Sequence, residues 1–146
     1  MAMERDKVEL ILPPSVITNT RPIQHYNMLS NWITPWDFQE QIDAAIIGVP
    51  YGFTGEAAAP DSFREQFRSL ATRNANYDAD PAPLKVRDVG NVVMHPTNVF
   101  RCHENVEKAL TDLYNIDRDF VPIIVGGDHS VAAPSYRAFK QVRGEK

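Results

Sequence analysis

The stretch Phe120-Val-Pro-Ile-Ile-Val-Gly-Gly-Asp-His-Ser130 joins an apolar run to a glycine turn that carries an acid and an imidazole. Its β-branched residues predict a buried strand that ends at Gly126. Pro122 is tolerated because the opening position of a strand need not donate to the ladder. After the turn, residues 131–142 carry apolar side chains at helical spacing. A strand, a turn and a helix therefore follow one another here.

The same succession occurs twice upstream. Asp43-Ala-Ala-Ile-Ile-Gly-Val-Pro50 predicts a strand covered on both faces, and residues 62–70 predict a helix. Residues 86–94 and 103–113 predict a second strand and an amphipathic helix. Strands that alternate with helices imply parallel βαβ units. The fold class is therefore α/β, a three-layer α/β/α arrangement with a mostly parallel sheet, present as an incomplete half because the alternation stops after a helix.

Composition excludes several classes of protein. The 146 residues include 15 basic and 19 acidic ones, a net charge of −4, with no basic block that would bind nucleic acid. Hydrophobic residues at 43% are typical of a globular chain, and no apolar run is long enough for a membrane span or a secretory signal. The single cysteine, Cys102, cannot form an internal disulfide, so a reducing, cytoplasmic setting and a buried, small side chain are expected.

Two segments are expected. Residues 1–41 combine scattered Pro, Asn and Thr with bulky apolar residues, which predicts an ordered amino-terminal arm in which Trp32 and Trp36 pack against the core or an interface. Residues 42–146 form the α/β domain.

The turn at residues 126–130 is the candidate site, since ligands gather beyond the carboxyl ends of parallel strands. Gly126 and Gly127 allow a sharp turn, and a neutral imidazole at His129 could bind a transition metal. The alternative is a purely structural turn in which Asp128 or Ser130 caps the next helix.

These residues carry a resemblance to a known family. The Gly-Gly-Asp-His-Ser turn after an apolar strand resembles the first metal-binding motif of the ureohydrolases, the family of arginase, agmatinase and formimidoylglutamase. Ile47-Gly-Val-Pro-Tyr51 and Ala59-Pro-Asp-Ser-Phe-Arg64 are similar to the family's first strand and the start of its first helix. Asp88-Val-Gly-Asn91 resembles the second strand, where the family usually has Asp-x-Gly-Asp. Asn91 departs from the last Asp, which puts a structural hydrogen bond in doubt.

The resemblance implies an arginase-like fold and a two-manganese site. His129 matches a metal ligand, and Asp128 matches a neighbouring acid that supports the site from behind. The family's Asp-Ala-His-x-Asp and Asp-x-Asp motifs have no counterpart before Lys146, so the chain is expected to hold at most one manganese ion weakly and to contribute no catalytic residue. The implied reaction is hydrolysis of a guanidino or formimidoyl C–N bond in a small amidine or guanidine substrate. Met94-His-Pro-Thr97 favours the formimidoylglutamases.

Other candidate residues have simpler interpretations. Arg64 matches the family's helix-start arginine, but an arginine on an amphipathic helix is more often solvated or salt-bridged. His25, His95 and His103 lack the spacing of metal ligands and are interpreted as structural.

A second function class stays open beside the hydrolase, namely a non-catalytic binding or assembly module that keeps the half-sheet and accepts an anion at the helix after Gly127. Because the strand at 121–125 would lack one neighbour and carries no lysine, self-association through its edge is also expected.

Overall fold

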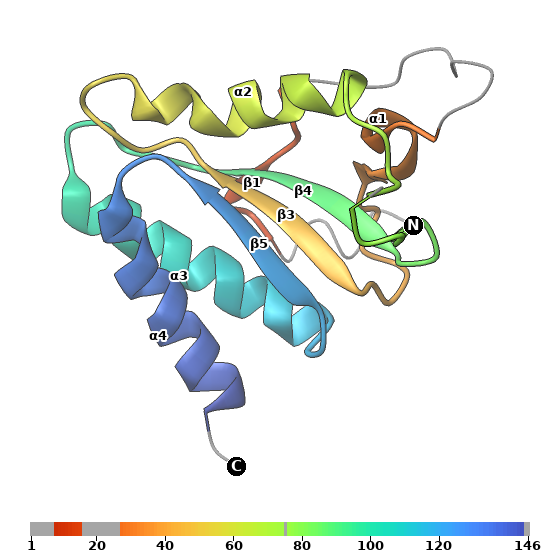
Figure 1. The fold of residues 1–146 in the computed structure, drawn as a ribbon. Coiled ribbons are helices and arrows are strands. Elements are labelled where there is room, and N and C mark those ends of the chain that lie inside the picture. The colour runs from red at the N-terminus through yellow and green to blue at the C-terminus, as the bar shows by residue number, and fades with distance from the viewer. Residues whose placement is uncertain (1–7, 16–26, 75, 145–146) are drawn as a thin grey trace.

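The computed structural model describes residues 8–15, 27–74 and 76–144. Its sheet has the strand order β1-β4-β3-β5, and β2 also pairs with β4 (Figure 1). The strands β2, β3, β4 and β5 run parallel where they pair, and β1 is antiparallel to β4. The helices and strands are β1 Ile11–Leu12, α1 Leu29–Trp32, β2 Thr34–Pro35, β3 Ala44–Val49, the 3-10 helix η2 Glu56–Ala58, α2 Ala59–Glu65, η3 Gln66–Arg68, β4 Val86–Val92, α3 Val99–Ile116, β5 Val121–Gly126, η4 His129–Val131 and α4 Ala132–Arg143.

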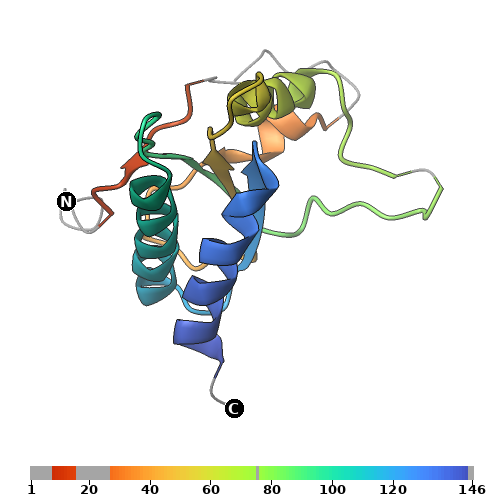
Figure 2. The same ribbon diagram turned by 90° about the vertical axis from the view of Figure 1, so that its left-hand side faces the viewer.

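Helices cover both faces of the sheet. The helices α3 and α4 lie together on one face, and α1 and α2 lie on the other (Figures 1 and 2). The central strand β3 is buried along nearly its whole length because it receives side chains from both layers. This arrangement confirms the predicted α/β/α fold with a mostly parallel sheet.

The main core lies between the sheet and α3. The apolar face of α3 is fully buried at Val106, Ala109, Leu110 and Leu113. This helix begins earlier than residue 103, the predicted start, because the side chain of Asn98 accepts a hydrogen bond from the backbone N–H of Arg101 and caps the first turn. The helix predicted over 62–70 corresponds to α2, which begins earlier, at Ala59, and ends earlier, at Glu65. The chain then tightens into the 3-10 turn Gln66–Arg68.

The described part of the amino-terminal segment packs onto the same core. Strand β1 pairs with β4, and Val8, Trp36 and Phe38 join the main apolar cluster. Trp36 therefore packs as expected. The division of the chain near residue 42 stays a prediction. No helix among the described residues has the length and apolar character needed to cross a bilayer.

A buried arginine fixes α2 to the sheet. Arg64 has no exposed surface, and its Nε and Nη2 donate to the two carboxylate oxygens of Asp88 at 2.6 and 2.8 Å. Nη2 also donates to the backbone oxygen of Gly90 at 3.0 Å, and Nη1 lies 3.5 Å from the Asp61 carboxylate. The expectation of a solvated arginine is wrong, because the side chain points into the sheet, and the expectation of a salt bridge is confirmed.

Asn91 completes this cluster. Its side-chain oxygen accepts a hydrogen bond from Nη1 of Arg64 at 2.7 Å. The hydrogen bond that the departure from aspartate puts in doubt is therefore present. An amide oxygen supplies the acceptor without adding a second carboxylate to Asp88, so the buried charges of Arg64 and Asp88 stay balanced.

We expect Arg64→Met to lower the free energy of unfolding by about 3–5 kcal/mol, because it leaves the Asp88 carboxylate buried without its partner. Urea denaturation followed by circular dichroism measures the change. The matched control is Arg101→Met on the exposed surface of α3, for which a change within about 0.5 kcal/mol is expected. Equal, small effects of the two substitutions would show that the ion pair does not stabilise the packing of α2.

Candidate functional site

The turn at residues 126–130 is bonded directly to the end of the neighbouring strand. The backbone N–H of Gly127 donates to the oxygen of Val49 at 3.1 Å, and that of Asp128 donates to the oxygen of Tyr51 at 2.9 Å. Strands β3 and β5 thus continue their pairing past their last ladder residues. The turn is held at the carboxyl edge of the sheet, where an α/β fold places its ligands.

Gly127 is required at this turn by lack of space. A Cβ atom at this position would lie 1.9 Å from the backbone oxygen of Tyr51 and 2.9 Å from that of Glu56. Both contacts are with backbone, which cannot move aside as a flexible side chain can. Gly126 is less constrained, because a Cβ atom there would meet a side-chain methyl of Val131 at 2.7 Å.

Asp128 points back toward its own helix. Its Oδ1 accepts a hydrogen bond from the backbone N–H of Ser130 at 2.6 Å, so the capping role considered as an alternative is observed. This bond and one from the Ser130 hydroxyl hold the pKa of Asp128 below its ordinary value, and the charges of His103 and His129 add to the effect. Since the folded-state pKa is lowered, the carboxylate stabilises the turn above its unfolded-state pKa and loses that effect as the pH falls through the folded value.

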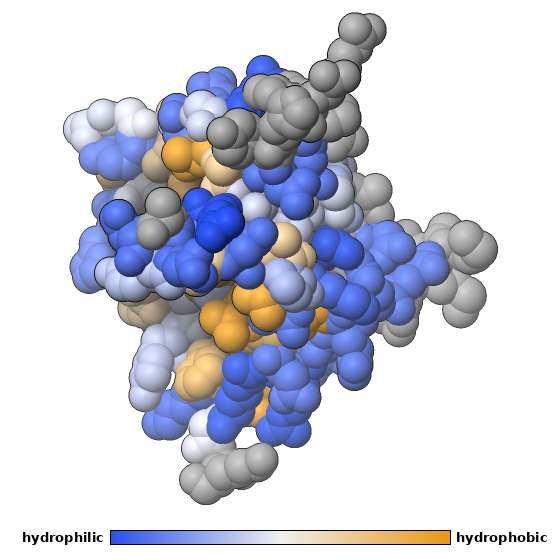
Figure 3. Space-filling view, turned by 45° about the vertical axis from the view of Figure 1, so that its right-hand side comes forward, coloured by the Kyte–Doolittle hydropathy of each residue, from blue (hydrophilic) through white to orange (hydrophobic). Residues whose placement is uncertain are grey.

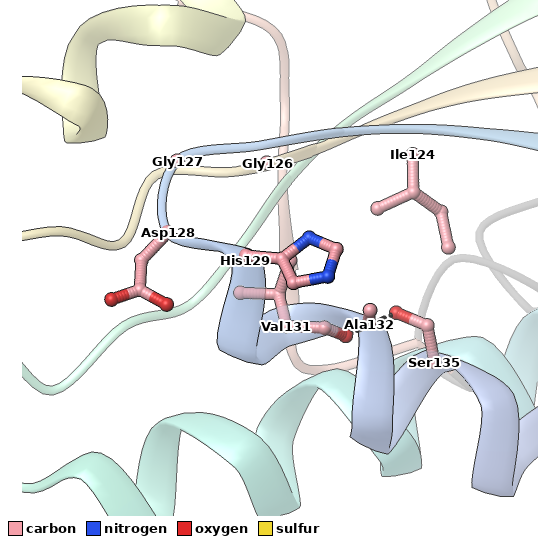
Figure 4. A pocket seen from close by; sticks show the side chains of 8 residues that line it. All are labelled: Ile124, Gly126, Gly127, Asp128, His129, Val131, Ala132 and Ser135. Atoms are coloured by element: carbon pink, nitrogen blue, oxygen red, sulfur yellow. Dashed lines mark hydrogen bonds between the residues drawn. The ribbon is translucent and has the colours of Figure 1, made fainter.

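His129 is exposed and points the other way. Figure 4 shows its imidazole on the opposite side of the turn from Asp128, directed into a cavity of about 400 Å³. The lining of this cavity is Ile124, Gly126, Gly127, Asp128, His129, Val131, Ala132 and Ser135. The imidazole is thus available to a ligand, while the turn behind it is fixed by backbone hydrogen bonds.

The loop after β3 brings further polar groups near the turn. Glu56 accepts hydrogen bonds from the hydroxyl and the backbone N–H of Thr54, which lower its pKa. Tyr51 is buried, and burial raises its pKa, with smaller contributions from Cys102 and Asp128. None of these groups donates to or accepts from the His129 imidazole in any hydrogen bond found among the described residues.

The other histidines lie in different environments. His103 lies on α3, and its Nε2 is 3.0 Å from Oγ of Ser130, so one of the histidines interpreted as structural reaches the candidate turn. The sequence gives no sign of this contact, because the two residues are 27 positions apart. The backbone of His95 bonds the thiol of Cys102, which is buried as expected. His25 lies outside the described residues.

The described residues do not by themselves fit a two-metal site. Such a site needs several bridging and terminal carboxylates around metal ions about 3.5–4 Å apart. Within residues 8–15, 27–74 and 76–144, no three His, Cys, Asp or Glu side chains gather in a group that could hold a metal ion. The turn offers one imidazole, and the carboxylate of Asp128 is engaged with Ser130.

A second cavity lies at the opposite, amino-terminal edge of the strands and contains several carboxylates. Two of these have local structural partners. Asp117 accepts from the backbone N–H of Ile42 at 3.0 Å, and Asp43 accepts from that of Lys85 at 2.7 Å. These bonds close the loops before β3 and β4, so this cavity is explained by the fold.

The sheet is mostly parallel and is covered by helices on both faces, and a glycine turn with an exposed histidine lies at the carboxyl end of β5. This is the architecture of an α/β protein, a class whose ligands gather at that edge of the sheet. Comparison with known protein families identifies the family of this chain. The Arginase family model matches residues 42–146, and the chain belongs to this family.

Individual relatives agree with this assignment. The formimidoylglutamase of Halalkalibacterium halodurans is 29% identical over 126 residues, which are 83% of this chain and 40% of the relative. The mitochondrial agmatinase of Gallus gallus is 31% identical over 91% of this chain and 40% of its own length. The crystal structure of Bacillus subtilis formimidoylglutamase superposes with a TM-score of 0.77 at 24% identity, over 86% of this chain and 41% of that one. The chain therefore spans about 40% of the length of the relatives it matches.

A Trypanosoma cruzi formiminoglutamase crystallised with Mn²⁺ shares the fold, with a TM-score of 0.67 at 24% identity over 81% of this chain and 42% of that one. Manganese is thus found in a member of the same fold. These likenesses confirm the arginase-like architecture, present here as part of the larger fold.

We expect Gly127→Ala to displace the turn and to lower the free energy of unfolding by about 1–3 kcal/mol, the usual cost of forcing an extra methyl group into a packed site. Gly126→Ala is the matched control and is expected to cost less, because its neighbour is a side chain that can rotate. Urea denaturation gives the stability, and amide chemical shifts of Tyr51 and Asp128 report the displacement. Equal effects of both substitutions would contradict the close backbone approach at Gly127.

Proposed function

We propose that this chain is the amino-terminal portion of a manganese-dependent ureohydrolase that hydrolyses a C–N bond of a linear amidine or guanidine. The observation that carries the proposal is the exposed His129 imidazole, directed into a cavity from a turn fixed at the carboxyl edge of the sheet. Family membership over residues 42–146 supports the reaction class. The single cysteine favours a reducing, cytoplasmic setting.

Each residue of the turn has a part in this proposal. His129 is a metal ligand, because a neutral imidazole at the mouth of a cavity has a free lone pair for the metal. Asp128 supports the site from behind by holding Ser130 and so fixing the turn. Gly126 and Gly127 let the backbone pass close to β3. No catalytic residue is assigned within the chain.

A formimidoylglutamase-like or agmatinase-like substrate is favoured. Relatives with these names are among the matches, and Met94-His-Pro-Thr97 resembles the formimidoylglutamases. In either case water attacks the amidine or guanidine carbon and the C–N bond breaks, releasing formamide or urea. A metal pair supplies hydroxide near neutral pH for this attack when it is bound.

The chain alone is proposed to be inactive. A single imidazole could hold at most one manganese ion, and weakly, because manganese in proteins prefers carboxylate, carbonyl and water oxygens. The remaining ligands of a two-metal site would have to come from outside the described residues.

A second candidate function, assembly through the sheet edge, is favoured by a separate observation. Among the described strands, β5 lies at the end of the order and pairs with β3 alone. Its residues Val121 and Ile123 are 58% and 40% exposed. One face of the molecule carries hydrophobic side chains in its middle with hydrophilic ones around them (Figure 3). An open apolar edge favours pairing with another strand.

We expect the purified chain, supplied with Mn²⁺, to release neither formamide from formimidoylglutamate nor urea from agmatine or arginine. A longer polypeptide that contains this chain and the missing ligands is expected to be active with Mn²⁺ and to lose most activity on His129→Ala while keeping its circular dichroism spectrum. The matched control is His95→Ala in the same polypeptide. Metal-dependent turnover by the chain alone, or full activity of the His129→Ala variant at limiting Mn²⁺, would refute the proposal.

We also expect the chain to sediment as a dimer or larger species at micromolar concentration, and Ile123→Lys to shift it to monomer, since a lysine on an edge strand opposes pairing. Phe100→Lys, at a position that is 82% exposed on α3, is the control and should leave the assembly unchanged. A cooperatively folded monomer of the unmodified chain would rule out assembly through this edge.

A further inference from the structure

A hydrogen bond links the first part of α3 to the candidate turn. Nε2 of His103 lies 3.0 Å from Oγ of Ser130, and both residues are partly buried. The Tyr51 ring meets the His103 ring edge to face, with centroids 6.2 Å apart. The imidazole is therefore held between an aromatic ring from the loop after β3 and a hydroxyl from the turn after β5.

Ser130 is also hydrogen-bonded to Asp128. Its backbone N–H donates to Oδ1 of Asp128 at 2.6 Å. Its hydroxyl is the group that bonds His103. These two hydrogen bonds connect His103, Ser130 and Asp128 in series.

A serine bonded to a histidine near an aspartate is also the pattern of a nucleophile with its base, and the structure decides between the two roles. A nucleophile has to face the space that a substrate occupies. The cavity at the turn is lined by His129 and Ser135, whereas neither Ser130 nor His103 lines it. The Ser130 hydroxyl is directed toward α3 and acts within the protein.

We propose that His103 is a positioning residue that, through Ser130 and Asp128, fixes the 126–130 turn in the conformation that directs His129 into the cavity. This inference rests on the proposed role of His129 for its functional meaning. The effect of His103 on the rigidity of the turn does not depend on that role. A rigid turn matters because a ligand must be held close to its productive geometry, and a neighbouring hydrogen-bond network commonly provides that restraint.

Amide hydrogen exchange of the ¹⁵N-labelled chain tests the proposal. His103→Ala is expected to speed exchange at Gly127, Asp128 and Ser130 about three- to tenfold, the effect of losing one side-chain hydrogen bond. Amides of β3 and β4 should exchange as before. His103→Gln should restore slow exchange at the turn, since its side-chain N–H can still reach Ser130 Oγ. The matched control is His95→Ala, which should leave the turn unchanged.

Ser130→Ala provides a second route if His103→Ala destabilises the fold. It should reproduce the faster exchange at Asp128, and His103→Gln should no longer keep exchange slow in its presence, because the bond needs the Ser130 hydroxyl. Unchanged exchange at the turn in His103→Ala, or a uniform increase over β3, β4 and the turn together, would overturn the proposal. Because exchange reports the turn itself, a failure of His129 to bind metal would count against the proposed function and not against this test.

Discussion

The close approach of Gly127 to the backbone oxygen of Tyr51 is the constraint on which the site depends. It allows the N–H groups of residues 127 and 128 to bond Val49 and Tyr51, so that the ends of β3 and β5 are joined beyond the sheet ladder. Any side chain at position 127 would push the two strand ends apart. Because of this contact, the direction of His129 is fixed by the backbone of the central strand.

A second fixed point lies on the face of the sheet that α2 covers. The guanidinium of Arg64 is buried, and carboxylate, amide and backbone oxygens surround it. Four hydrogen bonds offset the cost of removing this charge from water. Loss of either Arg64 or Asp88 would leave the other charge buried without its partner, so both are needed for stability. The pair connects α2 to β4, and α2 follows the loop that carries Tyr51 and Glu56. The two anchors therefore hold both ends of the loop that lies against the turn.

The sequence predicts those parts of the fold that depend on local pattern. The three main strands, the helices between them and the glycine turn all follow from apolar runs, periodicity and turn residues. The predicted burial of β5 is wrong, because this strand lies at the end of the described sheet and none of its residues is fully buried. Helix ends were less predictable, since the cap at Asn98 and the tightening after Glu65 depend on single contacts. Long-range pairs were not predictable at all. Neither the burial of Arg64 nor the bond between His103 and Ser130 leaves a sign in local composition, because each joins residues that only the folded sheet brings together.

The proposed metal site is the turn at the carboxyl edge of the sheet, and not the carboxylate-lined cavity at its amino edge. Paramagnetic broadening of amide resonances by Mn²⁺ tests this directly, because it detects weak binding and reports distance from the ion. On titrating the ¹⁵N-labelled chain, broadening should begin at His129 and spread over residues 126–135, and His129→Ala should abolish it. Broadening that begins instead at Asp43, Asp117 and Asp119, or that is uniform over the surface, would contradict the account.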